Sequence, residues 1–404
     1  MLTSLYPSAI RPYEGIFAER RWTRMRARGH EVSVTHPLPR APLAFGRREW
    51  AEIRQMPAEE ERGGIVIRRP RYLHVPRRTR ANARAFANTG LRRILRTGRP
   101  DVVVADYAWP ASAAAAPCAR RGLPLVVSGR GSDVLQVAGE AGLGADLGAN
   151  LRAAGHWCAV SRDLLGVMDR LGERPDHGVL VPNGVDLDLF RPRDRGEARA
   201  ALGLDATPWI CLVVGHLIER KDPLLALRTW HAWTQAARAS SSLVFVGDGP
   251  LAGALDREIA TLGVGEQVRR ITRLPPEELA QWYAAADALL LTSWREGRPN
   301  VVLEALACGL PILATEAGGT SELLEGLDGM LARTRDPRQL AKMLDATLSH
   351  PLETAGRGVL RDHARRFTWD NGLEALEACL EAAIAEGPGA GGTGGTGEAR
   401  EARK

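Results

Sequence analysis

The segment Ala288–Gly309, ALLLTSWREGRPNVVLEALACG, indicates the fold class of this chain. It begins with an apolar run that ends at Leu291, continues through a short polar loop, and places Pro299 where a helix would begin. Proline is favoured in the first helical turn because its φ is fixed and no N–H is needed there. The segment therefore predicts a buried strand, a loop and a helix ending near Gly309. This is the repeating unit of a parallel α/β sheet.

Similar short apolar runs occur along the rest of the chain, separated by stretches of helical length. Runs that are apolar throughout are typical of strands covered on both faces by helices. We therefore expect an α/β protein with two Rossmann-like, doubly wound domains. The predicted strands are Val102–Ala105, Leu123–Val127, Val179–Val181, Ile210–Val214, Leu243–Val246, Ala288–Leu291 and Pro311–Ala314.

The domain organisation follows from an interruption in this spacing at residues 186–208, where we place a hinge. A chain of 404 residues is too long for one core, because single cores stop growing near ~250–300 residues. We expect an N-terminal domain, a C-terminal domain, a last helix that packs back on the N-terminal domain, and a disordered Gly-rich tail. Their bounds are 1–190, 191–368, 369–386 and 387–404. The first strand is either very short or begins before Met1 in the natural protein.

Composition excludes several classes of protein. Hydrophobic residues make up 45% of the chain and charged residues 25%, which excludes a mostly disordered protein. No stretch approaches the ~20 apolar residues of a spanning helix, and the N-terminus lacks the pattern of a secretory signal. The five cysteines lie far apart, which indicates buried thiols and not a disulfide framework or a zinc site. We expect a cytoplasmic protein.

The charge distribution is uneven along the chain. Residues 1–130 hold 25 arginines, no lysine and 10 acidic residues, a net charge of +15, whereas the remaining 29 basic and 38 acidic residues give −9. This favours an anionic partner for the first domain, either a membrane surface or nucleic acid, over a merely solvated surface. One helix-compatible stretch, residues 77–96, either lies on an anionic membrane or packs its apolar side on the sheet. Its relevant residues are Arg77, Arg78, Arg80, Arg84, Arg92, Arg93 and Arg96, with Phe86, Leu91, Ile94 and Leu95.

Two glutamates of the opening segment are candidates for chemistry. Glu296 lies in the loop before the predicted helix, whose N-terminus offers free N–H groups and a positive dipole end to an anion such as a diphosphate. Glu304 follows eight residues later, about one and a half turns into the helix, where it can accept hydrogen bonds from a sugar diol. The spacing alone is weak evidence, but the strand–loop–helix context strengthens it.

The chain resembles the retaining glycosyltransferases of family 4, whose GT-B fold has two Rossmann-like domains facing a central cleft. The resemblance extends to about residue 386 and is strongest to the group that includes teichuronic acid and exopolysaccharide transferases. It implies that Glu296 lies at the transferred sugar and Glu304 at the nucleotide ribose. The segments that carry it are EGRPNVVLEALACGLPILAT (296–315), EAGGTSELL (316–324), VFVGDGP (244–250), VVGHLIERKDP (213–223) and VLVPNGVDLDLF (179–190).

The resemblance implies a donor site in the second domain. The family places a lysine against the diphosphate where this chain has Lys221, and a cation there would stabilise the leaving group. The family often has arginine at the position of His216, which leaves the role of this histidine open. The further residues that we assign to donor binding are Gly215, Gly297, Pro299, Asn300 and Val301, with Gly15 from the first domain and Gly318 and Gly319 before another helix.

The first domain is expected to hold the acceptor side. The segment YPSAIRPYEGIF (6–17) resembles the family's first loop, with the single Gly15 where relatives carry paired glycines. Many family members have histidine where this chain has Arg130, and arginine cannot act as a general base at neutral pH. We therefore assign Arg130 to charge stabilisation, and Ser132 and Asp133 to the acceptor side. The alternative is a surface ion pair between Arg130 and Asp133.

No metal or cofactor is expected. Asp186 and Asp188 have the D-x-D form used by metal-dependent transferases of another fold, but here they stand in a segment that the family uses as an interdomain connection. GT-B enzymes bind the diphosphate without an obligatory metal. The histidines are scattered without metal-ligand spacing.

The sequence thus predicts a metal-independent retaining glycosyltransferase that moves a sugar from a nucleotide-diphosphate sugar to a glycan or lipid-linked acceptor. Synthesis of a cell-surface polysaccharide or glycolipid is the expected role, with peripheral contact on the inner face of the membrane and no nucleic-acid partner. Two alternatives stay open: a nucleotide-sugar 2-epimerase of the same fold, and an Arg-rich nucleic-acid-binding protein. No nucleic-acid-binding motif accompanies the charge.

Overall fold

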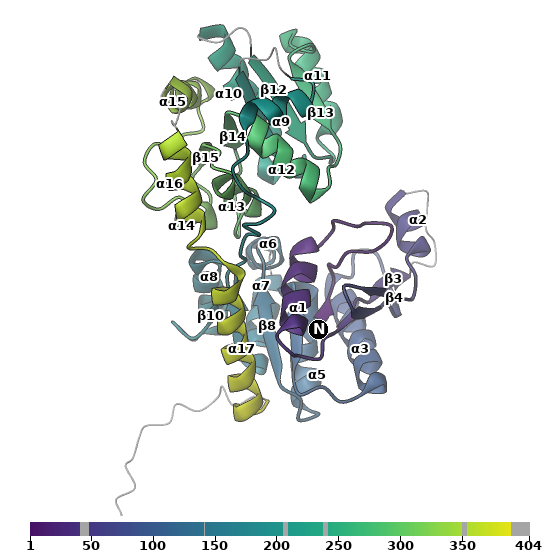
Figure 1. Cartoon of the computed structure of the whole chain (residues 1–404). Helices are drawn as coiled ribbons and strands as arrows, with labels where there is room; N and C mark the ends of the chain where they lie inside the picture. Colours follow the sequence, from purple (N-terminus) through teal and green to yellow (C-terminus); the bar gives the residue numbers. More distant parts are fainter. Residues whose placement is uncertain (41–47, 141, 205–208, 237–240, 350–353, 389–404) are drawn as a thin grey trace, which may run out of the picture. The chain divides into compact units, whose positions relative to one another are not determined.

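The computed structural model describes residues 1–40, 48–140, 142–204, 209–236, 241–349 and 354–388, and these residues form two compact units (Figure 1). The first unit is discontinuous in sequence and consists of Met1–Val160, Leu164–Val181 and the chain from Leu373 onward. The second consists of Ser161–Asp163 and Pro182–Gly372. Most of the tail predicted to be disordered, residues 389–404, lies outside the described residues.

The first unit is built on an eight-stranded sheet in the order β10-β9-β8-β7-β1-β2-β5-β4, as counted over the described residues. All neighbours are parallel except β4 and β5. A separate parallel pair joins β3 to β6. The strands are β1 Leu2–Thr3, β2 Ser33–Thr35, β3 Leu38–Arg40, β4 Glu59–Arg62, β5 Ile65–Arg68, β6 Arg71–Leu73, β7 Val103–Asp106, β8 Leu125–Gly129, β9 Gly155–Ala159 and β10 Val179–Leu180.

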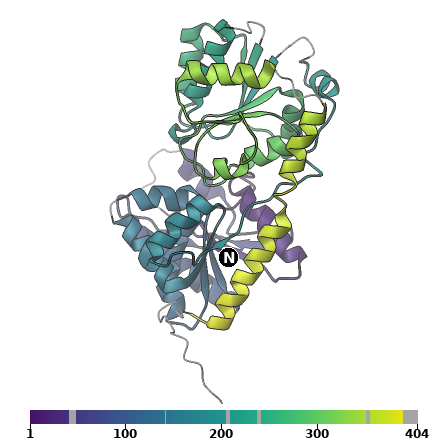
Figure 2. The same ribbon diagram turned by 90° about the vertical axis from the view of Figure 1, so that its left-hand side faces the viewer.

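Helices cover both faces of this sheet because successive strand residues point to opposite sides. Val103, Leu125 and Val127 pack with α3 and with the helices from α4 to α8. Helices α1 and α17 lie on the same side of the sheet as one another (Figures 1 and 2). The helices are α1 Ile16–Ala27, α2 Arg48–Gln55, α3 Thr79–Thr97, α4 Ala108–Ala111, η1 Ser112–Ala114, α5 Ala115–Ala119, α6 Ser132–Gly139, α7 Leu143–Ala154, α8 Arg162–Gly172 and α17 Trp369–Glu386.

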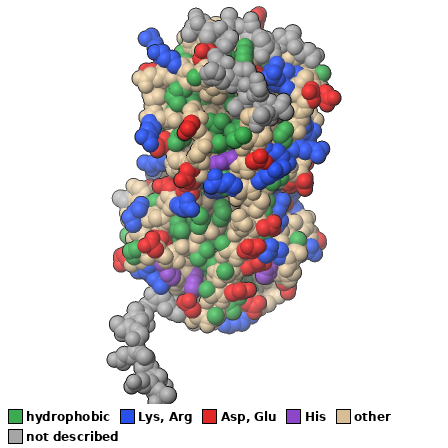
Figure 3. Space-filling view, turned by 60° about the vertical axis from the view of Figure 1, so that its left-hand side comes forward, with side chains coloured by type: hydrophobic (Ala, Val, Ile, Leu, Met, Phe, Trp, Pro, Cys, Tyr) green, Lys and Arg blue, Asp and Glu red, His purple; other side chains and the backbone are tan. Residues whose placement is uncertain are grey.

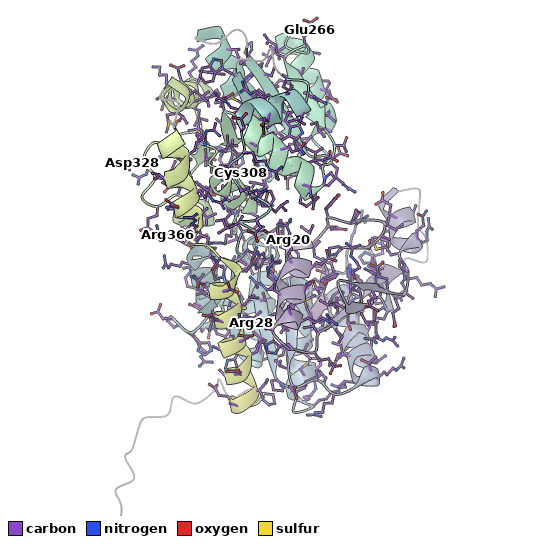
Figure 4. The ribbon with its side chains drawn as sticks, viewed as in Figure 1. Arg20, Arg28, Glu266, Cys308, Asp328 and Arg366 are labelled. Atoms are coloured by element: carbon purple, nitrogen blue, oxygen red, sulfur yellow. The ribbon has the colours of Figure 1, made fainter. Side chains whose placement is uncertain are left out.

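A carboxylate ties α17 to the end of α1. Glu377 accepts hydrogen bonds of 2.8 Å from Nε and Nη2 of Arg28 and lies 2.9 Å from Nε2 of His30. Figure 4 labels Arg28, which lies against α17. These contacts lower the pKa of Glu377 to about 2, chiefly through the hydrogen bonds from Arg28 and His30.

The second unit has a six-stranded, fully parallel sheet in the order β13-β12-β11-β14-β15-β16, again over the described residues. The register places Leu212 of β11 opposite Leu289 of β14. The strands are β11 Trp209–Val214, β12 Ser241–Val246, β13 Val268–Ile271, β14 Ala288–Leu291, β15 Ile312–Thr315 and β16 Leu331–Ala332.

The two faces of this sheet have separate cores, as the alternation of strand residues requires. Ile210, Leu212 and Leu289 pack against α12, α13, α14 and α16, whereas Cys211 and Phe245 pack against α10, α11 and α15. The helices are α9 Arg195–Ala201, η2 Glu219–Lys221, α10 Pro223–Ala236, α11 Ala252–Leu262, α12 Pro276–Ala285, α13 Asn300–Ala307, α14 Gly319–Leu323, α15 Pro337–Ser349 and α16 Thr354–Ala364.

The predicted strands are confirmed, with ends shifted by up to two residues, and so is the strand–loop–helix unit of the opening segment. Pro299 is the N-cap of α13, one residue before its first helical residue. Gly309 follows the C-cap with φ of 68°, a left-handed conformation that ends the helix.

The Arg-rich stretch forms α3 and its approach. Phe86, Leu91 and Ile94 are buried in the core of the first unit, so the apolar side of α3 packs on the sheet. Of the two alternatives for this stretch, the structure therefore has the one in which the apolar side packs on the sheet. Some arginines are paired with acids, such as Arg80 with Asp146 and Arg93 with Glu59. Basic and acidic side chains are interspersed over the face drawn in Figure 3.

Within the residues that the structure describes, no helix combines the length and the apolar character needed to cross a bilayer.

Candidate active site

The second unit has a topological switch point between β11 and β14. From β11 the chain goes on to β12 on one side, whereas β14 and β15 extend the sheet on the other. Crevices at the carboxyl ends of such neighbouring strands are the usual ligand sites of open α/β sheets. A small hollow lies at this edge. Its lining consists of Val213, Val214, Gly215, His216, Leu217, Lys221, Pro223, Leu290, Leu291 and Thr292.

Glu296 lies next to this hollow in the loop after β14, and it is only 4% exposed. Its Oε1 is 2.5 Å from Nζ of Lys221 and accepts a 2.6 Å hydrogen bond from Oγ of Ser293. Its Oε2 is 3.2 Å from Nη1 of Arg220. Burial by itself raises the pKa of Glu296, but the charges of Lys221 and Arg220 and the hydrogen bonds outweigh burial and hold the pKa below its usual value. Glu296 is therefore a buried carboxylate in its ionised form.

The two cations reach Glu296 from η2, the short turn after β11. Asp222 follows this turn with φ of 46°, and its carbonyl accepts from the Thr292 hydroxyl at 2.8 Å. The carbonyl of Arg220 accepts from N of Trp294 at 2.8 Å. These bonds fix the loop after β11 to the loop after β14, which places Lys221 and Glu296 together.

Glycines allow the loop of Glu296 to lie against the start of α14. A Cβ atom on Gly318 would lie 2.4 Å from the carbonyl oxygen of Glu296, and one on Gly319 would lie 2.0 Å from that of Gly297. The N–H of Gly319 points to the Glu296 carbonyl at 3.3 Å. Both glycines thus have a role in backbone packing beside the site. Gly215, with φ of 146°, has a similar close neighbour in Gly247. A Cβ atom on Gly247 would lie 1.9 Å from the carbonyl oxygen of Gly215.

The N-terminus of α13 begins with Asn300 and Val301, directly after the Glu296 loop. Asn300 lies 3.3 Å from Asn183 through their side-chain amides. This helix has eight residues. The first N–H groups of an α-helix have no acceptor within the helix, and its N-terminus is the positive end of the dipole, so this end suits an anion.

Glu304 is buried on α13 and accepts a 3.1 Å hydrogen bond from the hydroxyl of Tyr283. Tyr283 belongs to α12 and packs edge-on against Phe190, with ring centroids 5.9 Å apart. Its hydroxyl fixes the orientation of the Glu304 carboxylate.

The first unit has its own switch point, between β1 and β7, and Arg130 lies at this edge after β8. Arg130 binds Asp106, the last residue of β7, in a bidentate pair with both distances 2.7 Å. Trp22 donates from Nε1 to the same carboxylate at 2.7 Å. Burial would raise the pKa of Asp106, but the charge of Arg130 and these hydrogen bonds lower it well below its usual range. The pair is a buried, charge-assisted one.

Asp133 and Ser132 begin α6 at the same edge. Asp133, in the first turn of α6, reaches back and accepts backbone hydrogen bonds from Arg130 at 3.0 Å and from Gly131 at 2.7 Å, just before the helix. The surface ion pair considered between Arg130 and Asp133 is therefore wrong, because the guanidinium binds Asp106. Burial raises the pKa of Asp133 to about 6, against the effect of the backbone N–H groups. Ser132 lies 2.7 Å from the hydroxyl of Tyr107.

Gly15 ends the first loop and precedes α1 with φ of 76°. A Cβ there would lie 2.8 Å from the carbonyl of Leu5, so the loop closes on itself at this residue.

The predicted residues therefore fall into two groups, one at the carboxyl edge of each sheet. Lys221, Glu296 and the glycines of the second unit lie together, and Arg130, Ser132 and Asp133 lie together in the first. Sequence analysis missed the side chains that orient them, namely Asp106, Trp22, Arg220, Ser293 and Tyr283. Asp106 is the one that a signal could have identified, since it is an acidic residue directly after a predicted strand.

Asp186 has a local structural role. Its Oδ1 accepts from the backbone N–H groups of Asp188 at 3.2 Å and of Leu189 at 3.1 Å, which forms a turn. Over the described residues no group of three or more His, Cys, Asp and Glu side chains could hold a metal ion.

Family models match both halves of the chain. One described as Glycosyltransferase Family 4 matches residues 22–189, and one described as Glycosyl transferases group 1 matches residues 208–350. TuaC of Bacillus subtilis, which its name assigns to teichuronic acid biosynthesis, is 30% identical over 85% of this chain and 87% of its own. The chain belongs to glycosyltransferase family 4. Membership of family 4 makes it a retaining glycosyltransferase.

Other relatives match only in part. The D-inositol 3-phosphate glycosyltransferase 1 of Catenulispora acidiphila is 36% identical over 54% of this chain and 54% of its own. The chain thus spans about half the length of this relative.

Solved structures agree on the fold. Sucrose-phosphate synthase from Thermosynechococcus elongatus has a TM-score of 0.73 at 19% identity, covering 92% of this chain and 93% of its own. HepE from Anabaena, solved in complex with UDP-glucose, has a TM-score of 0.70 at 18% identity, covering 94% and 99%. The two parallel α/β units are those of a GT-B glycosyltransferase.

Proposed function

We propose that this family 4 enzyme transfers a sugar from a nucleotide-diphosphate sugar to a hydroxyl of a glycan or lipid-linked acceptor, in the synthesis of a cell-surface polysaccharide or glycolipid. The observation that carries the proposal is the buried, ionised Glu296, held by Lys221, Arg220 and Ser293 beside the hollow at the β11/β14 switch point.

The donor is proposed to bind at this edge of the second unit. An ammonium group has three N–H donors, so Lys221 can hold Glu296 and a diphosphate oxygen at the same time. The N-terminus of α13 at Pro299, Asn300 and Val301 would supply further N–H groups to the phosphates. Departure of the diphosphate builds negative charge on its oxygens, and preorganised cations and dipoles stabilise that charge without reorganisation.

Glu296 is proposed to act on the transferred sugar. The sugar becomes positively charged as its bond to the diphosphate lengthens, and an ionised carboxylate nearby stabilises that charge. The lowered pKa of Glu296 suits this role, because the group carries its negative charge throughout the neutral range. Glu304, oriented by Tyr283, is proposed to accept hydrogen bonds from the nucleotide ribose.

The first unit is proposed to supply the acceptor side through Arg130, Ser132 and Asp133. The pair with Asp106 keeps the guanidinium charged and in one orientation. A polysaccharide role is supported by the likeness to TuaC over most of both chains. HepE, a structural relative solved with UDP-glucose, supports testing UDP-sugars first.

The test is a panel of UDP-, GDP- and ADP-sugars screened for thermal stabilisation, followed by product analysis with the best donor. A ligand at 100 times its Kd raises the free energy of unfolding by about 2.7 kcal/mol, which is readily detected. Donor without acceptor should give slow hydrolysis. An epimerised sugar in that reaction would instead identify a 2-epimerase and contradict the proposal.

The proposed chemistry needs no metal, since Lys221 and α13 would neutralise the diphosphate. Exhaustive EDTA treatment is therefore expected to leave most of the activity. Complete loss of activity, with recovery on adding Mn²⁺ or Mg²⁺, would contradict this part of the proposal.

A further inference from the structure

An exposed tryptophan lies in the same loop as Glu296. Trp294 is 58% exposed, whereas the other tryptophans of the described chain are buried or half-buried. Burying so large an apolar ring would stabilise the fold, and this chain leaves the ring in water instead. Exposed aromatic rings of this kind are typical of binding surfaces.

The ring of Trp294 is held in place by Arg335. The guanidinium carbon of Arg335 lies 3.6 Å from the indole centroid, a cation–π stack that covers one face of the ring. Arg335 comes from the loop between β16 and α15, and Trp294 from the loop after β14. The stack thus lies at the same carboxyl edge of the sheet as the hollow.

Arg335 is itself fixed by four hydrogen bonds. Its Nη2 donates to Oδ2 of Asp222 at 2.7 Å and to the carbonyl of Thr292 at 3.0 Å. Its Nη1 donates to the carbonyl of Ser293 at 3.1 Å and to Oγ1 of Thr315 at 3.4 Å. A guanidinium with this many partners cannot swing away, so the indole it supports is a preorganised surface.

We propose that Trp294, supported by Arg335, is a stacking platform for a sugar ring of the acceptor glycan. One face of a pyranose carries C–H groups and is apolar, while its edges carry hydroxyls. An indole offers a matching apolar face, and the charged groups around it can bind the hydroxyls. This proposal rests on the proposed function, because it presumes a glycan acceptor.

The surroundings favour a sugar over a hydrocarbon chain. Trp294 stacks on Arg335, which is paired with Asp222, and is followed by the exposed Arg295, and burying these charges under lipid would be costly. The position favours the acceptor over the donor sugar. Trp294 is absent from the lining of the hollow, and its ring is exposed, whereas the carboxylate of Glu296 is buried.

The decisive variants are Trp294→Ala, which removes the platform, and Trp294→Tyr, which keeps an aromatic face. Arg335→Lys keeps the charge and removes the planar stack. Val359→Ala is the matched control, because Val359 is equally exposed, at 59%, but lies on α16 away from this edge. Binding to an array of bacterial polysaccharide fragments is measured in the presence of UDP, and UDP affinity is titrated separately.

The expected result is a drop of about tenfold in array binding for Trp294→Ala, a smaller drop for Arg335→Lys, and near wild-type binding for Trp294→Tyr and Val359→Ala. UDP affinity should be unchanged in Trp294→Ala, Trp294→Tyr and Val359→Ala. With an acceptor that the wild-type enzyme glycosylates, Trp294→Ala should raise the KM for the acceptor about tenfold. The KM for the donor and the rate of donor hydrolysis without acceptor should not change.

Three results would overturn the platform. They are undiminished array binding by Trp294→Ala, no glycan binding by the wild type, and, when co-sedimentation with phosphatidylglycerol vesicles is measured in parallel, a loss of vesicle binding by Trp294→Ala without a loss of array binding. Failure of the proposed function would look different, because it would appear as the absence of nucleotide-sugar turnover in the wild type.

Discussion

The ammonium group of Lys221 lies 2.5 Å from Oε1 of Glu296. The resemblance to family 4 assigns these residues to different parts of the donor, the diphosphate and the transferred sugar. Their direct contact makes them one electrostatic unit, in which the charge of Lys221 helps to lower the pKa of Glu296.

Glu296→Ala is expected to lower kcat by an amount equal to about 2–4 kcal/mol of transition-state stabilisation, because the carboxylate would no longer stabilise the charged sugar. Glu304→Ala should instead mainly raise the donor KM. Steady-state kinetics over a matrix of donor and acceptor concentrations separates the two effects. Wild-type kcat in Glu296→Ala would contradict the assignment.

Asp106→Asn is expected to destabilise the first unit by about 3–5 kcal/mol, because it leaves the buried guanidinium of Arg130 without its counter-charge. The double variant Asp106→Asn with Arg130→Met should recover much of that stability, since the uncompensated charge is gone. Chemical denaturation monitored by fluorescence measures both. A double variant less stable than Asp106→Asn would mean that the charge imbalance is not the cause.

Gly319→Ala is expected to destabilise the Glu296 loop by at least about 2 kcal/mol and to reduce activity, because the new Cβ would lie 2.0 Å from the carbonyl oxygen of Gly297. Gly253→Ala in α11 is the control. Its nearest neighbour is the flexible end of Arg257 at 3.6 Å, so it should be neutral or stabilise by up to about 1 kcal/mol. Equal melting temperatures for the two variants would count against the close backbone packing.

Glu377 makes stability depend on pH. Its pKa is about 2 in the folded chain and near 4.5 when unfolded, so its pairing stabilises the fold above pH ~4.5 and the effect is lost as pH falls toward 2. With discount for solvent screening, Glu377→Gln should cost about 1 kcal/mol at pH 7 and much less at pH 3. Melting curves of both proteins at the two pH values test this. A difference that grows on acidification would reverse the sign and refute it.

Arginines before and within α3 are expected to support electrostatic docking on anionic membranes. Arg77, Arg78, Arg80 and Arg84 are exposed, and each basic residue near such a surface contributes about 1 kcal/mol. Co-sedimentation with phosphatidylglycerol vesicles should be seen at low salt, and should be lost at high salt and when all four are changed to glutamine. Because the apolar side of α3 is buried, neutral vesicles should not bind. Equal binding to neutral and anionic vesicles would show that these charges play no part.

Sequence patterns predicted the strands that are apolar throughout, and missed those that are not. Val268–Ile271 contains two arginines and forms the edge strand β13, while Gly155–Ala159 of β9 includes a glycine and a histidine although it is buried. Ser33–Thr35 of β2 has only three residues, too few for a periodic signal. Edge position, short length and tertiary burial are not properties of a local window.

The site shows the same division. Glu296, Lys221 and α13 could be predicted because the chemistry and the local elements lie within short segments. The partners that orient them could not, because Trp22 and Asp106, or Trp294 and Arg335, meet only after the sheets form. Their separations in sequence carry no pattern that a motif search would detect.

The discontinuous first unit has a consequence for synthesis on the ribosome. Because its last helix, α17, follows the whole of Pro182–Gly372, the second unit can fold while the first still lacks that helix. Until then, the surface that covers Leu376 and Ala383 of α17 is open to water and available to chaperones or to other nascent chains. Truncation before Leu373 should therefore yield an aggregation-prone product, even though it leaves both candidate sites untouched.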